Sequence, residues 1–209
     1  MFLKQVVNRA LIRQASVPMR GLKLHEYQAG ALLESNKVPV AIGRVAFNAN
    51  DAEKVCGEFP AGAEYVVKAQ VLTGGRGLGT FSSGFKGGVH IVDTPSKVKE
   101  IATQMLGNNL ITKQSGPAGF PCSAVYMVEK LGITKEFYLS CTLDRVQQCP
   151  TFIYSAAGGM NIEDVAEKTP ELVFKLPIRE EGVIPNSEMV LAAERLGVPT
   201  EVDQVSNMF

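Results

Sequence analysis

The residues best suited to chemistry form one stretch, in which a lysine on a predicted strand precedes a glycine-rich loop. The stretch has the sequence VVKAQVLTGGRGLG and runs from Val66 to Gly79. Because glycine has no Cβ, such a loop lets backbone N–H groups approach phosphate oxygens closely. Lys68 offers a point charge and Arg76 a planar set of donors, and both suit a polyphosphate. Alternation along the strand places Lys68 on the face opposite Val67, where its charge needs an anion or solvent.

Two common nucleotide motifs do not fit this loop. The Walker pattern GxxxxGK[ST] is absent from the chain. A dinucleotide fingerprint needs GxGxxG at the start of a helix, but Gly75, Arg76 and Gly77 supply only GxG and the residue at position 80 is Thr80. A glycine-rich hairpin that binds nothing is the alternative to a phosphate loop, and these residues alone leave both open.

Two carboxylates stand at the ends of predicted strands. Glu129 follows the apolar run VYMV, and Glu136 opens the next strand. Carboxylates in such places can accept hydrogen bonds from an adenine amino group or from ribose hydroxyls. Taken alone, the residues favour the simpler alternative, in which both side chains lie in solvent.

Alternating helices and strands must position these residues. Strands are predicted at 38–47, 65–71, 88–92, 124–129, 136–144, 151–155 and 171–176. Helices are predicted at 24–34, 51–58, 94–106, 161–167 and 187–196, with Asn50 or Asp51 capping the second and Thr94 or Ser96 the third. Neighbouring strands in the second half indicate an α+β fold rather than a doubly wound sheet.

Composition excludes several classes of function. The 209 residues contain 21 basic and 21 acidic side chains, which argues against broad binding to nucleic acid or an anionic membrane. The apolar runs are shorter than the roughly 18 residues of a membrane span, so we expect a soluble protein. The cysteines lack CxxC spacing, and His25 and His90 are each expected to be structural. We therefore predict no metal ligand and no catalytic residue.

The first 25 residues are basic and contain no acidic side chain. The first acidic residue of the chain is Glu26. Apolar residues recur among the basic ones at near-helical spacing, which is typical of a mitochondrial transit peptide. The uninterrupted apolar core of a secretory signal is missing. We predict a transit peptide at 1–21, with a basic first helix of the mature fold as the alternative.

Several motifs in order resemble the N-terminal half of succinyl-CoA ligase β subunits. They are LHEYQ at 24–28, VVKAQV at 66–71, GGRG at 74–77, KGGV at 86–89, LDR at 143–145, GG at 158–159 and IEDVA at 162–166. The resemblance implies an ATP-grasp fold, in which two α+β lobes clamp a nucleotide. The nucleotide-binding positions it implies are Lys68 at the phosphates, Gly75, Arg76 and Gly77 in the loop over them, Glu129 at the adenine and Glu136 at the ribose.

The resemblance also implies reactants and a setting. These are ATP or GTP, magnesium, and a separate α subunit whose phosphorylated histidine couples the nucleotide to succinyl-CoA. Because that reaction belongs to the citric acid cycle, the resemblance implies the mitochondrial matrix, in agreement with the predicted transit peptide.

The resemblance fades after residue 198. The family's magnesium ligands and its C-terminal domain, which meets the α subunit, are expected beyond residue 209. We predict an incomplete ATP-grasp domain at 22–198, truncated before the end of its second lobe, and a divergent tail at 199–209. The chain alone is expected to be inactive. Three hypotheses stay open: part of a ligase subunit, a non-catalytic short form that binds nucleotide or a partner, and a different ATP-grasp enzyme.

Overall fold

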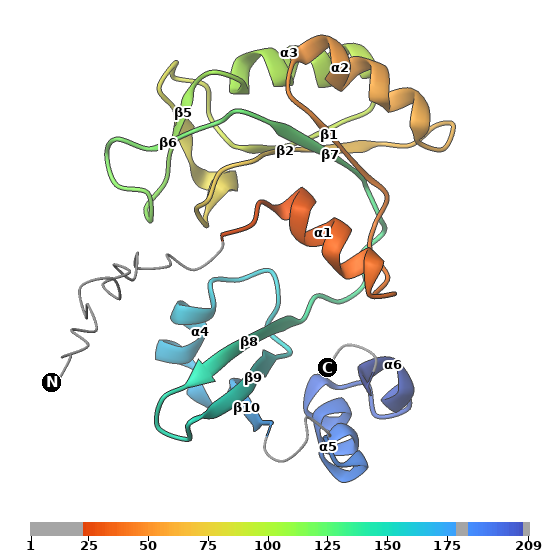
Figure 1. The fold of residues 1–209 in the computed structure, drawn as a ribbon, viewed down its shortest axis with the longest axis vertical. Coiled ribbons are helices and arrows are strands. Elements are labelled where there is room, and N and C mark those ends of the chain that lie inside the picture. The colour runs from red at the N-terminus through yellow and green to blue at the C-terminus, as the bar shows by residue number, and fades with distance from the viewer. Residues whose placement is uncertain (1–22, 179–183, 207–209) are drawn as a thin grey trace, which may run out of the picture. The chain divides into compact units, whose positions relative to one another are not determined.

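The computed structural model describes residues 23–178 and 184–206, which fall into two compact units (Figure 1). The first unit contains residues 23–30, Gly43–Pro60 and Tyr65–Met127. The second contains Ala31–Ile42, Ala61–Glu64 and the described residues from Val128 onward. The predicted transit peptide at 1–21 lies outside the described residues.

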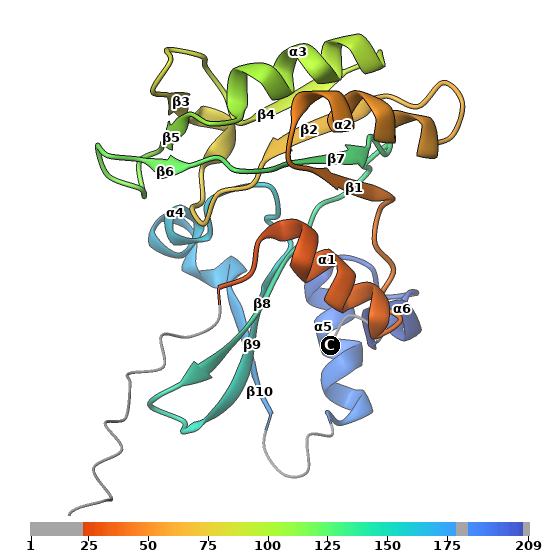
Figure 2. The same ribbon diagram turned by 45° about the horizontal axis from the view of Figure 1, so that its top comes forward.

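A four-stranded sheet of order β1-β7-β2-β4 organises the first unit. Its strands are β1 (Gly43–Ala46), β7 (Val125–Glu129), β2 (Tyr65–Ala69) and β4 (Val89–Val92). Helices α2 (Ala49–Lys54) and α3 (Pro95–Met105) lie side by side over one face (Figures 1 and 2). A smaller sheet joins β3 (Thr80–Phe81), β5 (Asn109–Ile111) and β6 (Phe120–Pro121).

Helix α3 shows how the sequence builds this layer. The Thr94 side chain caps the helix by accepting a hydrogen bond from the Lys97 N–H. Val98, Ala102 and Met105 recur at helical spacing and are fully buried, so they form the stripe that packs on the sheet. Two neighbouring strands, β2 and β4, are antiparallel.

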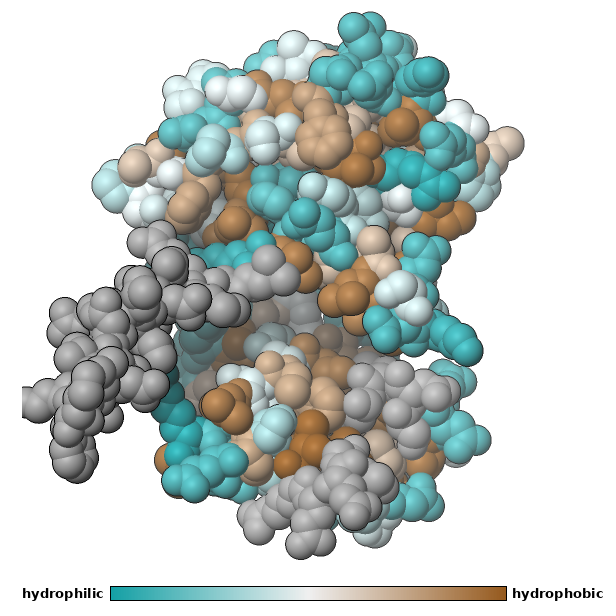
Figure 3. All heavy atoms as spheres, viewed as in Figure 1, coloured by the Kyte–Doolittle hydropathy of each residue, from teal (hydrophilic) through white to brown (hydrophobic). Residues whose placement is uncertain are grey.

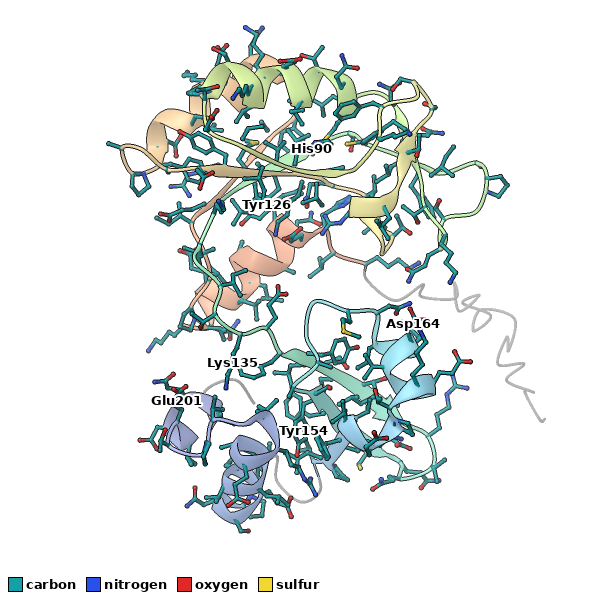
Figure 4. The ribbon with its side chains drawn as sticks, turned by 180° about the vertical axis from the view of Figure 1, so that it is seen from behind. His90, Tyr126, Lys135, Tyr154, Asp164 and Glu201 are labelled. Atoms are coloured by element: carbon teal, nitrogen blue, oxygen red, sulfur yellow. The ribbon has the colours of Figure 1, made fainter. Side chains whose placement is uncertain are left out.

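The second unit combines a meander with helices. Strands β8 (Tyr138–Asp144), β9 (Cys149–Ser155) and β10 (Phe174–Pro177) form an antiparallel sheet of order β10-β9-β8. The helices are α4 (Ile162–Lys168), α5 (Asn186–Leu196) and α6 (Val202–Ser206). Buried Tyr154 and Leu176 pack with the apolar face of α5. Lys135 donates a hydrogen bond to the Gly197 carbonyl just after α5 (Figure 4).

Helix α1 (Glu26–Ser35) begins in the first unit and ends in the second. In the first unit, Tyr126 of β7 packs against Tyr27 near the start of the helix, with ring centroids 6.4 Å apart (Figure 4). A Cβ on Gly30 would lie 3.4 Å from the Tyr126 hydroxyl. The first turn of α1 is therefore fixed on the sheet that also carries Lys68.

The predicted α+β class is confirmed, but some element bounds were wrong. The strand predicted at 38–47 is reduced to β1, and Pro39, which has no N–H to give to a ladder, lies outside it. The strand predicted at 171–176 starts later: Pro170–Leu172 forms a 3₁₀ turn, η3, which proline favours at its first position. The helix predicted at 51–58 starts earlier as α2, capped by Asn48 rather than by Asn50 or Asp51, and continues as the 3₁₀ turn η1 (Val55–Glu58).

Apolar side chains at the surface are mixed with polar ones. Figure 3 shows hydrophobic residues between hydrophilic ones on the face that it draws. Leu78 in the glycine-rich loop is 97% exposed, the highest value among the large apolar residues that the structure describes. Within the described ranges, no helix has the length and apolar character that a membrane crossing requires.

Candidate nucleotide site

Strand β2 delivers Lys68 to the start of the glycine-rich loop. Its residues alternate strictly, with Tyr65, Val67 and Ala69 buried and Val66 and Lys68 partly exposed. This pattern is the one the sequence predicts, and it places the ammonium group of Lys68 on the face away from Val67.

A three-residue cluster of Glu26, Lys68 and Arg76, hereafter the Glu26 cluster, forms beside that loop. Lys68 Nζ lies 2.7 Å from Glu26 Oε1, and Arg76 Nη2 lies 2.7 Å from Glu26 Oε2. Each carboxylate oxygen thus binds one cation, at the short distance typical of charge-assisted hydrogen bonds. The three side chains are 23–32% exposed, so they are screened less by water than a surface ion pair.

The two cations set the ionisation of Glu26. Partial burial of the carboxyl raises its pKa, but hydrogen bonds and charge attraction from Lys68 and Arg76 outweigh burial and hold the pKa below the ordinary 4.5. Glu26 is therefore a carboxylate at neutral pH. It gives the two basic side chains a shared anion within the protein itself.

Backbone contacts hold the cluster in place. The other arm of Arg76, Nη1, donates to the Ala69 carbonyl at 2.9 Å. Gln70, which is 1% exposed, donates to the Lys68 carbonyl at 3.2 Å and accepts from the Tyr27 N–H at 3.3 Å. Gln70 therefore ties the start of α1 to the end of β2, and so places Glu26 opposite Lys68.

Sequence reasoning gave Glu26 and Gln70 no role. Both stand inside motifs that carried the resemblance, LHEYQ and VVKAQV, and Glu26 is the first acidic residue of the chain. The available signal was a glutamine between two apolar residues near the end of the strand predicted at 65–71, because an amide buried there needs internal partners.

The glycine-rich loop turns sharply around Arg76. Gly75 has φ 70°, in the left-handed region that favours glycine, and Arg76–Leu78 forms one 3₁₀ turn, η2. The Gly88 N–H returns to donate to the Arg76 carbonyl at 2.8 Å. A Cβ on Gly88 would approach Leu110 Cδ2 to 2.8 Å, so this close packing requires glycine.

The same turn leaves donors available. No acceptor within the described part of the chain takes the backbone N–H of Arg76 or Gly77. A Cβ on Gly77 would meet no atom within 4 Å. The loop lines a pocket of about 410 Å³ together with Glu26 and Val71, a size within the range of small-molecule sites. Open N–H groups beside two cations make this pocket suited to an anion.

A neighbouring segment anchors the base of the loop. The hydroxyls of Thr73 and Thr112 are 3.0 Å apart, and the Gly74 N–H donates to Gln114 Oε1 at 3.0 Å. A Cβ on Gly74 would lie 2.6 Å from that Gln114 oxygen. The start of the loop is therefore anchored, while its tip at Gly75–Gly77 borders the pocket.

The structure brings together four of the six predicted site residues: Lys68, Gly75, Arg76 and Gly77. The other two, Glu129 and Glu136, belong to the second unit. Glu129 is half-buried at the end of β7. Glu136 is exposed just before β8, where its carbonyl accepts from the Gly158 N–H at 3.2 Å and its carboxylate lies against Gly159. Their nucleotide roles stay predictions.

The two histidines and the cysteines form no metal site within the described residues. His90 has a structural setting, stacked on Phe85 with Nε2 2.8 Å from the Gly87 carbonyl. His25 Nδ1 is buried with no hydrogen-bond partner, and its ring stacks on Tyr27. In the described ranges, no three His, Cys, Asp or Glu side chains come close enough to hold a metal ion. The four cysteines are free thiols.

Comparisons with curated proteins give relatives of this chain. The chain is 43% identical over 190 residues to the succinate–CoA ligase [ADP-forming] β subunit of Blastocystis sp. subtype 1, and 44% identical over 184 residues to the mitochondrial one of Arabidopsis thaliana. These alignments cover 89% and 84% of this chain but 45% and 44% of the relatives. It is also 43% identical over 180 residues, 86% of this chain and 41% of the relative, to the mitochondrial [GDP-forming] β subunit of Sus scrofa. The chain thus spans a little under half the length of these relatives.

Solved structures share the fold at low identity. An ATP citrate lyase from Methanothrix soehngenii superposes with a TM-score of 0.54 at 16% identity, over 84% of this chain and 42% of the other. A dinucleotide-forming acetyl-coenzyme A synthetase from Ca. Korarchaeum cryptofilum gives 0.56 at 16% identity, over 85% and 67%. The family described as "ATP-grasp domain" matches residues 23–209. The chain therefore belongs to the ATP-grasp domain family.

Proposed function

We propose that this chain is the nucleotide-binding part of a succinate–CoA ligase β subunit. In this role it would bind ATP or GTP for phosphoryl transfer to a histidine of a separate α subunit. The observation that carries the proposal is that Arg76, Gly77 and their open N–H groups line one pocket, together with Glu26, to which Lys68 is paired. Two cations and free amide donors match the charge and the acceptor oxygens of a triphosphate.

Each residue has a distinct task in this proposal. Lys68 neutralises phosphate oxygens as a point charge, and Arg76 uses its planar donors for two of them. Gly75 and Gly77 let the backbone approach the phosphates. Glu129 would accept from the adenine, and Glu136 from the ribose hydroxyls.

The names of the relatives support a proposal for the setting. Those from Arabidopsis thaliana and Saccharomyces cerevisiae are named mitochondrial, so we propose the mitochondrial matrix, with residues 1–21 as the transit peptide. One ADP-forming and one GDP-forming relative are each 43% identical to this chain, over 190 and 180 residues. Identity therefore gives no preference between ATP and GTP, and binding must be measured with both.

The described residues do not fit a resident magnesium site. Magnesium takes oxygen ligands in octahedral geometry, and no suitable cluster of acidic side chains is present among the residues that the structure describes. Glu26, whose carboxylate lines the pocket, already binds two cations. We assign no magnesium ligand to this chain and derive no step through the metal.

Calorimetry tests the proposal. ATP and GTP are titrated into the 209-residue chain, with and without magnesium, and into the double variant Lys68→Ala/Arg76→Ala. Charged hydrogen bonds contribute about 1.5–3 kcal/mol each, so the double variant should bind at least ~100-fold more weakly. Lys130→Ala is the matched control, because Lys130 makes a similar 2.6 Å ion pair with Glu64 in the other unit.

Unchanged affinity in the double variant would refute the phosphate site. Binding that depends on both residues, without succinyl-CoA formation after an α subunit is added, would instead favour a non-catalytic nucleotide-binding module.

A further inference from the structure

We propose that Glu26 is an internal counter-ion, which occupies the phosphate position between Lys68 and Arg76 and must be displaced when a nucleotide binds. The inference rests on the proposed function, since it concerns the same phosphate site. It assigns Glu26 a positioning role, because the residue acts through the two cations and not on the reacting atoms.

The geometry of the Glu26 cluster supports displacement. A carboxylate presents two acceptor oxygens, as one face of a phosphate does, and those of Glu26 bind Lys68 and Arg76 separately at 2.7 Å. A phosphate that uses both cations needs the same donor hydrogens. Carboxylate and phosphate therefore compete for one position.

The cations and the anion differ in how firmly they are held. Arg76 also donates through Nη1 to the Ala69 carbonyl, a hydrogen bond in which Glu26 takes no part, and Lys68 projects from a paired strand, β2. Glu26 starts α1 on a flexible side chain that is 32% exposed. Rotation of that side chain can free both cations without moving the sheet.

Glu26 also lines the pocket formed by the loop. If its carboxylate stayed beside an incoming phosphate, two anions would lie close together in a partly buried site, which is unfavourable. If it leaves, two short ion pairs are lost. Either way the carboxylate weakens anion binding, while in the empty site it offsets the repulsion between Lys68 and Arg76.

The test uses tripolyphosphate, which carries phosphates without a base, and ATP, both without magnesium. Glu26→Gln removes the charge and keeps the shape, so we expect on the order of tenfold tighter binding of both ligands, as for loss of a repulsive charge in a partly exposed site. Glu26→Asp keeps the charge but is too short to bridge both cations, and should bind about threefold more tightly. Glu64→Gln removes another ion-paired carboxylate and should change nothing.

Thermal unfolding separates displacement from a purely structural role. Without ligand, Glu26→Gln should have a lower Tm than the wild-type chain. With saturating tripolyphosphate, its Tm should rise by more than the wild-type value does. A merely structural residue would lower the Tm and weaken binding together.

Suppose that the wild-type chain binds polyphosphate through Lys68 and Arg76, and that a folded Glu26 variant binds it equally well or more weakly. This result would overturn the present inference but not the proposed function. Absence of polyphosphate binding by the wild-type chain and by every variant would overturn both the inference and the proposed function.

Discussion

Two glycines near the turn around Arg76 should respond differently when each is replaced by alanine: Gly88→Ala should lower stability, and Gly77→Ala should weaken ATP binding. At Gly88, a Cβ would come within 2.8 Å of Leu110 Cδ2 and 3.1 Å of the Arg76 carbonyl oxygen. Leu110 is fully buried and cannot move aside freely. We therefore expect Gly88→Ala to lower the free energy of unfolding by about 1–3 kcal/mol, the usual effect of overpacking.

At Gly77 the added methyl group would meet nothing within 4 Å, and its φ is not in the left-handed region. Gly77→Ala should therefore change the free energy of unfolding by less than about 0.5 kcal/mol. It should still weaken ATP binding about tenfold, because the methyl group would stand where a phosphate approaches the backbone, and such overpacking costs about 1–3 kcal/mol.

Urea unfolding followed by far-UV circular dichroism measures the first quantity, and calorimetry with ATP measures the second. The reasoning is refuted if Gly77→Ala is as destabilising as Gly88→Ala, or if Gly77→Ala binds ATP like the wild-type chain.

Three further outcomes follow from the contacts. Because the folded pKa of Glu26 lies below 4.5, its ion pairs should stabilise the fold fully above that pH and lose their effect as pH falls through the folded pKa. Urea unfolding of the wild-type chain and Glu26→Gln between pH 7 and 3 should then show two stabilities that converge in acid; a constant difference would contradict the ion pairs. Burial, with the nearby Glu53 charge, raises the pKa of Cys56 to about 11, and burial also raises the pKa of Cys122, whereas Cys141 is exposed. A thiol reagent at pH 8 should therefore label Cys141 first and the two buried thiols only in denaturant. Early labelling of Cys56 would disprove its burial. A Cβ on Gly158 would overlap the Glu136 backbone, while one on Gly132 would meet no atom within 4 Å. Gly158→Ala should therefore lower the free energy of unfolding by about 1–3 kcal/mol, and Gly132→Ala should leave it nearly unchanged. Thermal unfolding compares the two variants, and equal Tm values would show that the Gly158 contact is absent.

Elements with strong local signals could be predicted from the sequence. Thr94, one of the two caps predicted for α3, is its N-cap. The helix predicted at 161–167 is α4, with Asn161 as its N-cap rather than its first residue. The strict alternation of Val66, Val67 and Lys68 in β2 is also as predicted.

Weak or long-range signals explain what was missed. Strands β5 and β6 pair over only two residues, and β6 contains Pro121, so neither has a periodic pattern to detect. Helix α6 follows the last predicted helix and has only five residues, which is too short for a periodic pattern. The Glu26 cluster joins residues 42 and 50 positions apart, and no local rule connects residues at such separations.

The most direct test of the account is an amide NMR spectrum of the isotope-labelled chain, titrated with ATP. If the triphosphate binds at the Glu26 cluster, the largest shifts should come from the N–H groups of Gly75, Arg76 and Gly77 and from the start of α1. The amide of Val146 in the β8–β9 turn, which is 92% exposed and in the other unit, should not move. Saturable shifts elsewhere with an unchanged loop would contradict the proposed phosphate site.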